Sequence, residues 1–202
     1  MRAFIYDSAI LPLTTRWYSS VLERIGQGEH LLDVGIGTAG ALARNRVAVR
    51  ARRIKVTGVD IDEDYVKKAR SRIRKAGLDG CVEVQLESVY NHRGGPYDAV
   101  YFSSSFMLLP DPKGALDHVA ELLKPGGRIF FTQTFQERRS ALVERTKPLL
   151  QKVTTIDFGT VTYEDDFRQV VFSAGMELLE FSTLNRVSSM SGRLAVARLR
   201  AS

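Results

Sequence analysis

Short apolar runs alternate with stretches of helical periodicity along almost the whole chain. The apolar runs predict strands near residues 31–34, 54–60, 82–86, 99–103 and 128–134. Apolar residues three or four positions apart predict helices near residues 14–25, 40–49, 62–76, 115–123, 138–152 and 163–174. This alternation is typical of strand–helix units around a mostly parallel sheet.

The local signals at the ends of these elements refine the prediction. Thr14 or Thr15 is expected to cap the first helix, and the Pro-Gly-Gly at residues 125–127 to end the helix before it. Pro148 is expected to interrupt or end the helix at 138–152. Late strands near 176–184 and 193–200, joined across 188–192, predict an antiparallel pair.

We therefore expect one α/β domain over residues 1–202, with residues 1–28 as an N-terminal helical cap segment. Its doubly wound sheet would have about seven strands, mostly parallel, and would end in the antiparallel pair. A length of 202 residues suits a single domain, and 44% hydrophobic with 26% charged residues excludes a disordered chain.

The cysteine and hydropathy patterns narrow the class of protein further. Cys81 is the single cysteine, so an internal disulfide and a Cys-x-x-Cys redox pair are excluded. We interpret Cys81 as a buried filler at the start of a strand. The apolar runs are shorter than a bilayer span, and the N-terminus lacks the pattern of a signal peptide. A cytoplasmic protein is predicted.

Two basic runs, within residues 44–55 and 67–75, account for 12 of the 29 basic residues, and the formal net charge is +6. We prefer to interpret them as the solvated faces of two helices. The alternative is a patch that meets nucleic acid or an anionic membrane surface.

A glycine-rich turn carries the strongest chemical signal. Residues 33–40 read Asp-Val-Gly-Ile-Gly-Thr-Ala-Gly, a strand-to-helix turn whose small residues let a ligand approach the backbone. Asp60 ends the next strand, where a carboxylate can accept both hydroxyls of a ribose. This much also suits a nicotinamide cofactor. Asp33 favours a different ligand, because it stands where a nicotinamide fingerprint has an apolar residue and it can hold an amino group.

Four segments in chain order carry a family resemblance: 31–37 (Leu-Leu-Asp-Val-Gly-Ile-Gly), 58–61 (Gly-Val-Asp-Ile), 97–100 (Tyr-Asp-Ala-Val) and 122–128 (Leu-Leu-Lys-Pro-Gly-Gly-Arg). Together they resemble the class I S-adenosylmethionine-dependent methyltransferases over about residues 14–200. Within that family the chain is most similar to the small single-domain branch that includes quinone-biosynthesis and other small-molecule methyltransferases. The resemblance implies a Rossmann-like fold and S-adenosyl-L-methionine as cofactor.

The resemblance also implies a cofactor role for individual residues. Gly35, Gly37 and Thr38 would lie against the cofactor, and Asp33 near its methionine amino group. Asp60 would bind the ribose and Ile61 would pack on the adenine. Ser103, at the end of the fourth strand, would face the methyl site through its backbone.

The third strand departs from the family pattern at its end. The acid that usually accepts the adenine amino group is replaced by Ser88, and the nearest acid, Glu87, stands one position earlier. Either side chain is a candidate for the adenine contact, and Val89 is expected to flank the ring. Period-two alternation favours Ser88.

The acceptor site is less defined by the sequence. Ser-Ser-Ser-Phe at residues 103–106 replaces the Asn/Asp-Pro-Pro-aromatic signature of amino-group methyltransferases. Tyr6, Tyr18 and Phe106 are candidates for substrate contact, whereas His92 is interpreted as a surface-loop residue. The three histidines and the cysteine have no metal-ligand spacing, so no metal site is predicted.

Methyl transfer from a sulfonium needs no acid for the leaving group, so positioning can supply most of the catalysis. No catalytic residue is predicted. The favoured function is methyl transfer to a small-molecule or lipid-like acceptor. The alternatives are an RNA or protein methyltransferase, a catalytically silent S-adenosylmethionine-binding regulatory domain and, most distantly, a nicotinamide oxidoreductase.

Overall fold

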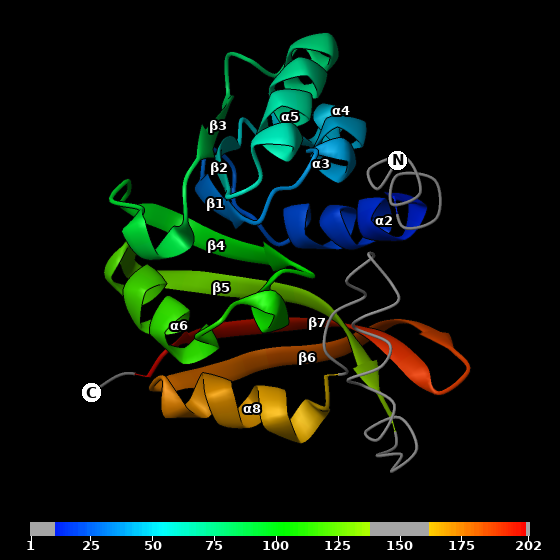
Figure 1. The fold of residues 1–202 in the computed structure, drawn as a ribbon, viewed down its shortest axis with the longest axis vertical. Coiled ribbons are helices and arrows are strands. Elements are labelled where there is room, and N and C mark those ends of the chain that lie inside the picture. The colour runs from blue at the N-terminus through cyan, green and yellow to red at the C-terminus, as the bar shows by residue number, and fades with distance from the viewer. Residues whose placement is uncertain (1–10, 138–161, 201–202) are drawn as a thin grey trace.

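The computed structural model describes residues 11–137 and 162–200, which form one twisted sheet with helices on both faces (Figure 1). The seven strands lie in the order β3-β2-β1-β4-β5-β7-β6. Their bounds are β1 His30–Val34, β2 Lys55–Asp60, β3 Val82–Leu86, β4 Tyr97–Ser103, β5 Leu123–Gln136, β6 Met176–Val187 and β7 Met190–Leu199. The first five strands pair in parallel, whereas β7 is antiparallel to both β5 and β6. The predicted fold class is therefore confirmed.

Helices cover the two faces of the sheet in separate groups. One face carries α2 (Leu11–Leu22), α3 (Gly40–Arg44), α4 (Arg46–Ala51) and α5 (Glu63–Ala76). The other carries α6 (Pro112–Glu121) and α8 (Glu164–Ser173), with the short 3₁₀ turns η1 (Val89–Asn91) and η2 (Phe106–Leu108). The central strands are buried on both faces, which is why they are near-continuous apolar runs in the sequence.

Helix α5 begins and ends at the residues that the sequence predicts. The Asp62 side chain accepts a hydrogen bond from the Tyr65 N–H at 3.0 Å, and Glu63 and Asp64 follow in the first turn. Gly77 ends the helix with a φ of +64°, a left-handed conformation that glycine adopts at little cost.

Helix α2 differs from its prediction, because it begins at Leu11 and runs through both threonines. Instead of capping the helix, the hydroxyls of Thr14 and Thr15 donate back to the Leu11 carbonyl, at 3.3 Å and 2.5 Å. Two polar contacts tie α2 and the turn that follows it to the distant strand β6. Trp17 Nε1 donates to Asn185 at 2.9 Å, and Arg24 binds Glu180 through two nitrogens, each at 2.8 Å.

Three other predicted boundaries also change. The helix expected up to Val49 is divided at Asn45 into α3 and α4. The Pro-Gly-Gly at 125–127 lies inside β5, where a register shift against β4 accommodates it, so it does not end α6. The late strands are longer than predicted and leave only residues 188–189 between them. The helix expected at 138–152, with Pro148, lies outside the described residues.

Chain order and strand order diverge between β1 and β4. After β1 the chain continues to β2 and β3 on one side, and β4 then returns to the other side of β1. Loops leaving β1 and β4 at their carboxyl ends therefore turn in opposite directions and leave a crevice between them. In open α/β sheets ligands bind in this crevice.

Candidate functional site

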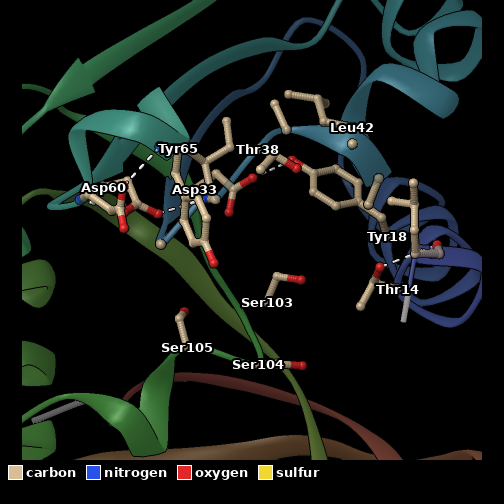
Figure 2. A pocket seen from close by; sticks show the side chains of 18 of the residues that line it. Thr14, Tyr18, Asp33, Thr38, Leu42, Asp60, Tyr65, Ser103, Ser104 and Ser105 are labelled. Atoms are coloured by element: carbon tan, nitrogen blue, oxygen red, sulfur yellow. Dashed lines mark hydrogen bonds between the residues drawn. The ribbon is translucent and has the colours of Figure 1, made fainter. Parts of the chain in front are cut away.

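A cavity of about 430 Å³ lies at the carboxyl ends of β1, β2 and β4. Its walls are the turn after β1, the end of β2 with the start of α5, the segment after β4, and one face of α2 (Figure 2). The sequence-predicted residues that line it are Tyr18, Asp33, Gly35, Gly37, Thr38, Asp60, Ile61 and Ser103. The fold thus brings residues from four separate segments to one place.

The glycine-rich turn forms the floor of the cavity. Gly35 and Gly37 have φ values of +74° and +58°, a backbone conformation that residues other than glycine rarely adopt. A Cβ on Gly35 would lie 2.7 Å from Cβ of Ser105, so this glycine allows close packing against the segment after β4. A Cβ on Gly37 would meet no atom within 4 Å. The backbone at Gly37 is therefore open to a ligand.

Asp60 holds this turn from the neighbouring strand. One carboxylate oxygen accepts from the Gly37 N–H at 2.8 Å, and the other accepts from the Asp62 N–H at 2.9 Å. Burial raises the pKa of Asp60, and the backbone N–H donors oppose that rise. Each oxygen retains a lone pair, so the carboxylate can still accept a ligand's hydroxyl groups.

Asp33 is the most deeply buried acid of the cavity, with 1% of its surface exposed. Its Oδ2 accepts from the Tyr18 hydroxyl at 2.8 Å, whereas Oδ1 is buried without a hydrogen-bond partner. Burial raises the pKa of Asp33 to about 7; the Tyr18 hydrogen bond opposes this rise, and the charge of Asp60 adds to it. A buried carboxyl oxygen without a partner is an acceptor for a missing donor.

The segment after β4 forms the wall opposite the glycine turn. Ser104 has a φ of +57°, and the Ser105 hydroxyl donates to the Val34 carbonyl at 2.5 Å. Leu108 lines the cavity with 46% of its surface exposed. Phe106 instead lies in the core at 1% exposure, in ring contact with Phe102, Phe131 and Phe167, and is not part of the cavity wall. Tyr6 lies outside the described residues.

Three predicted adenine contacts do not line the cavity. Glu87, the residue after β3, is engaged elsewhere, because its carboxylate lies 2.8 Å from Nδ1 of His92. Val89 is buried in the core, and Ser88 directly precedes η1. Their strand still ends beside the ribose candidate, since the Glu87 N–H donates to the Asp60 carbonyl at 3.0 Å. The adenine assignments stay predictions.

His92 corrects the interpretation of a surface-loop histidine, because only 2% of it is exposed. Its two ring nitrogens lie 2.8 Å from Glu87 and 2.7 Å from the Tyr97 hydroxyl, so the loop is folded around a satisfied imidazole. His118 lies on α6 and contacts the His92 carbonyl at 2.8 Å. Within residues 11–137 and 162–200 there is no group of three metal-ligating side chains.

The two basic runs lie mostly exposed on α3, α4 and α5, and five of their twelve basic side chains contact other parts of the chain. Arg50, Arg52 and Arg70 donate to backbone carbonyls of neighbouring elements, and Lys67 pairs with Glu63 at 2.9 Å. Arg72 reaches the glycine turn and donates to the Thr38 hydroxyl. These contacts agree with the interpretation of structural and solvated helix faces. Cys81 is partly buried and packs against the core, near its predicted role.

Leu108 belongs to the apolar run 106–109, which the sequence offers either as the wall of a substrate pocket or as ordinary packing, and it does line the cavity. The sequence did not indicate several other residues of the wall: Leu11, Thr14, Tyr65, Ser104 and Ser105. A signal was present in the first helix, since Leu11, Thr14 and Tyr18 are spaced at three and four residues and share a face. Their apolar and polar mixture is typical of a ligand-facing stripe, but only the docked position of α2 shows what the stripe faces.

Comparison with known proteins supports the methyltransferase resemblance. Residues 32–129 match the model of a methyltransferase domain. The ubiquinone biosynthesis O-methyltransferase of Bordetella avium is 29% identical over 213 aligned positions, covering 96% of this chain and 82% of that protein.

Solved structures support the fold. The [4+2]-cyclase SpnF superposes with a TM-score of 0.74 at 18% identity, covering 93% of this chain and 82% of the other. A geranyl diphosphate methyltransferase in complex with SAM gives 0.71 at 15% identity, covering 91% and 84%. The first of these is named as a cyclase, so the fold by itself does not determine the reaction. The family resemblance and the fold predicted from the sequence are both confirmed.

Proposed function

We propose that this chain, which belongs to the class I S-adenosylmethionine-dependent methyltransferases, transfers a methyl group to a hydroxyl oxygen of a small-molecule or lipid-like acceptor. The observation that carries the proposal is the cavity at the carboxyl ends of β1, β2 and β4, with Asp33, Gly37 and Asp60 on one side and the segment after β4 on the other. Its relatives are named as O-methyltransferases, which supports an oxygen acceptor.

The residues present fit S-adenosyl-L-methionine. The unpartnered Oδ1 of Asp33 offers an acceptor for the ammonium group of an amino-acid tail. Asp60, fixed beside the open backbone of Gly37, offers its carboxylate to ribose hydroxyls. Ile61 follows at the rim with 77% of its surface exposed, an apolar face suited to an adenine ring. When bound, the cofactor supplies an electrophilic methyl group on a sulfonium, and a neutral thioether leaves.

The chain's own residues hold the two reactants in position inside a cavity with apolar walls. Attack along the line of the breaking bond requires the acceptor oxygen close to the methyl carbon, and holding both reactants can supply about 7–11 kcal/mol. Apolar side chains of Leu11, Leu42 and Leu108 line the cavity and give it apolar walls. Ser103 and Ser104, at the end of β4, lie across the cavity from Asp33 and Asp60 (Figure 2), and we place the acceptor on their side.

A base is needed only where the acceptor hydroxyl must lose its proton during attack. The acids of the described cavity wall are Asp33, Asp60 and Asp62, all on the cofactor side. An acceptor whose hydroxyl is already acidic, such as a catechol or another phenol, suits this arrangement best. We therefore place phenolic oxygen first among the acceptor classes.

An RNA acceptor is the second candidate, and the two basic runs are its basis. Most of these basic side chains are exposed on α3, α4 and α5, but none of the described residues that line the cavity is a lysine or an arginine, so this charge lies away from the site where a phosphate would have to meet the methyl group. Small molecules are therefore favoured. The described residues hold no helix long and apolar enough to cross a membrane, and we propose a cytoplasmic location.

The test is a methylation assay with S-adenosylmethionine and a panel of catechols and phenols, each matched with its fully methoxylated analogue. We expect S-adenosylhomocysteine, and an acceptor heavier by one methylene, only from members with a free hydroxyl. Asp60→Ala is the control variant and should lose the product. Total RNA and denatured protein are included as competing acceptors.

Two results would overturn the proposal. Methyl incorporation into RNA alone would move the chain to the second candidate class. Cofactor binding with no methylated product from any acceptor would favour the silent regulatory domain.

A further inference from the structure

Tyr18 and Asp33 form a closed pair at the cavity wall, visible in Figure 2 as a tyrosine from α2 meeting an acid from β1. Both side chains are almost fully buried, at 2% and 1% exposure. The Tyr18 ring packs edge-on against Tyr101, with centroids 5.1 Å apart. Its helix is held against β6 by Trp17, and Arg24 in the turn after the helix binds the same strand. The Tyr18 hydroxyl is therefore fixed, and it fixes which oxygen of Asp33 remains available.

The titratable side chains around Asp33 come from three neighbouring elements. Tyr18 faces it from α2, Tyr101 lies opposite it on β4, and Asp60 lies at the end of β2. The described residues that line the cavity include three carboxyls, Asp33, Asp60 and Asp62, and no lysine, arginine or histidine. Arg72, which reaches the turn from α5, is bound to Thr38. The cavity thus supplies Asp33 with no counter-ion of its own.

We propose that Asp33, held by Tyr18, exchanges its own proton for the ammonium group of the cofactor's amino-acid tail, so that cofactor binding releases a proton. This inference rests on the proposed function, because it assumes the same cofactor in the same cavity. Tyr18 acts as a positioning residue: it occupies Oδ2 and leaves Oδ1 for the ligand. The substrate-contact role predicted for Tyr18 is replaced by this one.

The exchange balances in atoms and charge. In the empty cavity Asp33 is a neutral acid near pH 6; on binding, its O–H proton passes to solvent and the carboxylate accepts an N–H from the ammonium. The pKa of about 7, raised by burial, places the transition in the physiological range. At higher pH the ligand's ammonium loses its own proton and its charge, which weakens its bond to the carboxylate. Affinity should therefore pass through a maximum between these two transitions.

The experiment compares two ligands across pH with the full chain. S-adenosylhomocysteine carries the amino-acid tail, whereas 5′-methylthioadenosine shares the adenine, ribose and sulfur but lacks it. From pH 7.5 to pH 6 we expect the affinity for S-adenosylhomocysteine to fall roughly five- to tenfold. The affinity for methylthioadenosine should stay constant. Calorimetry in buffers of different ionisation enthalpy should detect proton release near pH 6 with the first ligand only.

Three variants separate positioning from folding. Asp33→Asn should lose the pH dependence and the proton release, with methylthioadenosine binding retained as evidence of an intact cavity. Tyr18→Phe should move the midpoint to higher pH, because the lost hydrogen bond was holding the Asp33 pKa down. Tyr101→Phe removes another buried hydroxyl on the same face, one bonded to Thr132, and should leave the midpoint in place.

The outcomes distinguish this inference from the proposed function. If S-adenosylhomocysteine binds with the same affinity from pH 6 to 7.5 and releases no proton, the exchange is wrong while the methyltransferase assignment stands. If Tyr18→Phe weakened the affinity for both ligands equally, with no change in the midpoint of the pH dependence, Tyr18 would have only a structural role. Failure of both ligands to bind the wild-type chain would remove the proposed function itself.

Discussion

Asp33 and Asp98 stand on neighbouring parallel strands, one near the carboxyl end of β1 and the other near the amino end of β4. Asp98 accepts from the His30 N–H and from Lys124, each at 2.8 Å. Although its partial burial raises its pKa, these hydrogen bonds together outweigh burial, and the pKa of Asp98 lies below its usual value. Asp33 has one donor, an oxygen without a partner, and a pKa raised by burial to about 7.

The same contrast extends along both edges of the sheet. At the amino edge Glu29 pairs with Arg128 at 3.3 Å and accepts from the Gly26 N–H at 2.8 Å, so its charges are satisfied within the chain. At the carboxyl edge Asp60 has two backbone N–H donors and Asp33 one hydroxyl donor, but neither pairs with a lysine or an arginine among the described residues. One edge therefore stabilises the fold, whereas the other retains unsatisfied groups that cost stability until a ligand arrives.

The largest expected effect is that replacing Asp33 and Asp98 by asparagine changes the stability of the ligand-free protein at pH 8 in opposite directions. A buried carboxyl with a raised pKa costs stability as pH rises from its unfolded value near 3.9 through about 7. The ligand-free wild type should therefore lose ~2–3 kcal/mol between pH 5 and pH 8 through this group. Asp33→Asn should lack that loss. Asp98, with its pKa lowered, stabilises the fold at pH 8, and Asp98→Asn should destabilise it by ~1–2 kcal/mol.

Urea unfolding of the ligand-free variants at pH 5 and pH 8 measures both effects. If Asp33→Asn and Asp98→Asn shifted the midpoint in the same direction at pH 8, the contrast between the two edges would be wrong. An Asp117→Asn variant serves as the control, because this exposed acid on α6 pairs only with Lys113 across one helical turn.

The next effect concerns ligand affinity. Asp60→Ala should weaken S-adenosylhomocysteine binding by ~1.5–3 kcal/mol, because hydrogen bonds to a charged acceptor are worth about that much. This corresponds to roughly one to two powers of ten in Kd. Asp98→Ala, at the opposite edge, should leave the affinity unchanged while lowering stability. Calorimetric titration of both variants decides the matter, and unchanged affinity in Asp60→Ala would mean that the ribose lies elsewhere.

Much of this fold and part of the site follow from the sequence alone. The strand–helix alternation predicts the sheet, and the helix predicted over residues 62–76 agrees with α5. The positions of Asp33, Gly37 and Asp60 in the cavity follow because parallel strands bring the residues at their carboxyl ends to one edge. These are consequences of local pattern and of topology.

The contacts that give the site its chemistry could not be predicted in the same way. Tyr18 meets Asp33 because of the way α2 docks on the sheet. That docking is stabilised by contacts of Trp17 and of Arg24, in the turn after α2, with Asn185 and Glu180 of β6, which lie far along the chain. His92 is buried because Glu87 and Tyr97 meet both of its ring nitrogens, and no periodicity indicates that. Pairing between distant elements depends on packing, and helical or strand periodicity carries no information about it.

Two glycines provide a matched test of the two edges. Gly37 and Gly126 have φ values of +58° and +76°, and a Cβ on either would meet no atom within 4 Å. Alanine at each position should cost ~1 kcal/mol of stability through backbone strain alone. Only Gly37→Ala places its methyl group in the cavity, so only this variant should also weaken cofactor binding. Equal affinities in the two variants would show that no ligand approaches the Gly37 backbone.

The smallest expected effect concerns the end of β3. We propose that Ser88 takes the position from which related enzymes hold the adenine amino group, so Ser88→Asp should tighten S-adenosylhomocysteine binding by ~0.5–1.5 kcal/mol, since charge-assisted hydrogen bonds are stronger than neutral ones. Glu87→Gln should leave the affinity unchanged, because the Glu87 carboxylate already pairs with His92 at 2.8 Å. Titration of both variants checks this. If Glu87→Gln weakened binding while Ser88→Asp did not tighten it, Glu87 would have to leave His92 for the adenine, and the assignment would pass to Glu87.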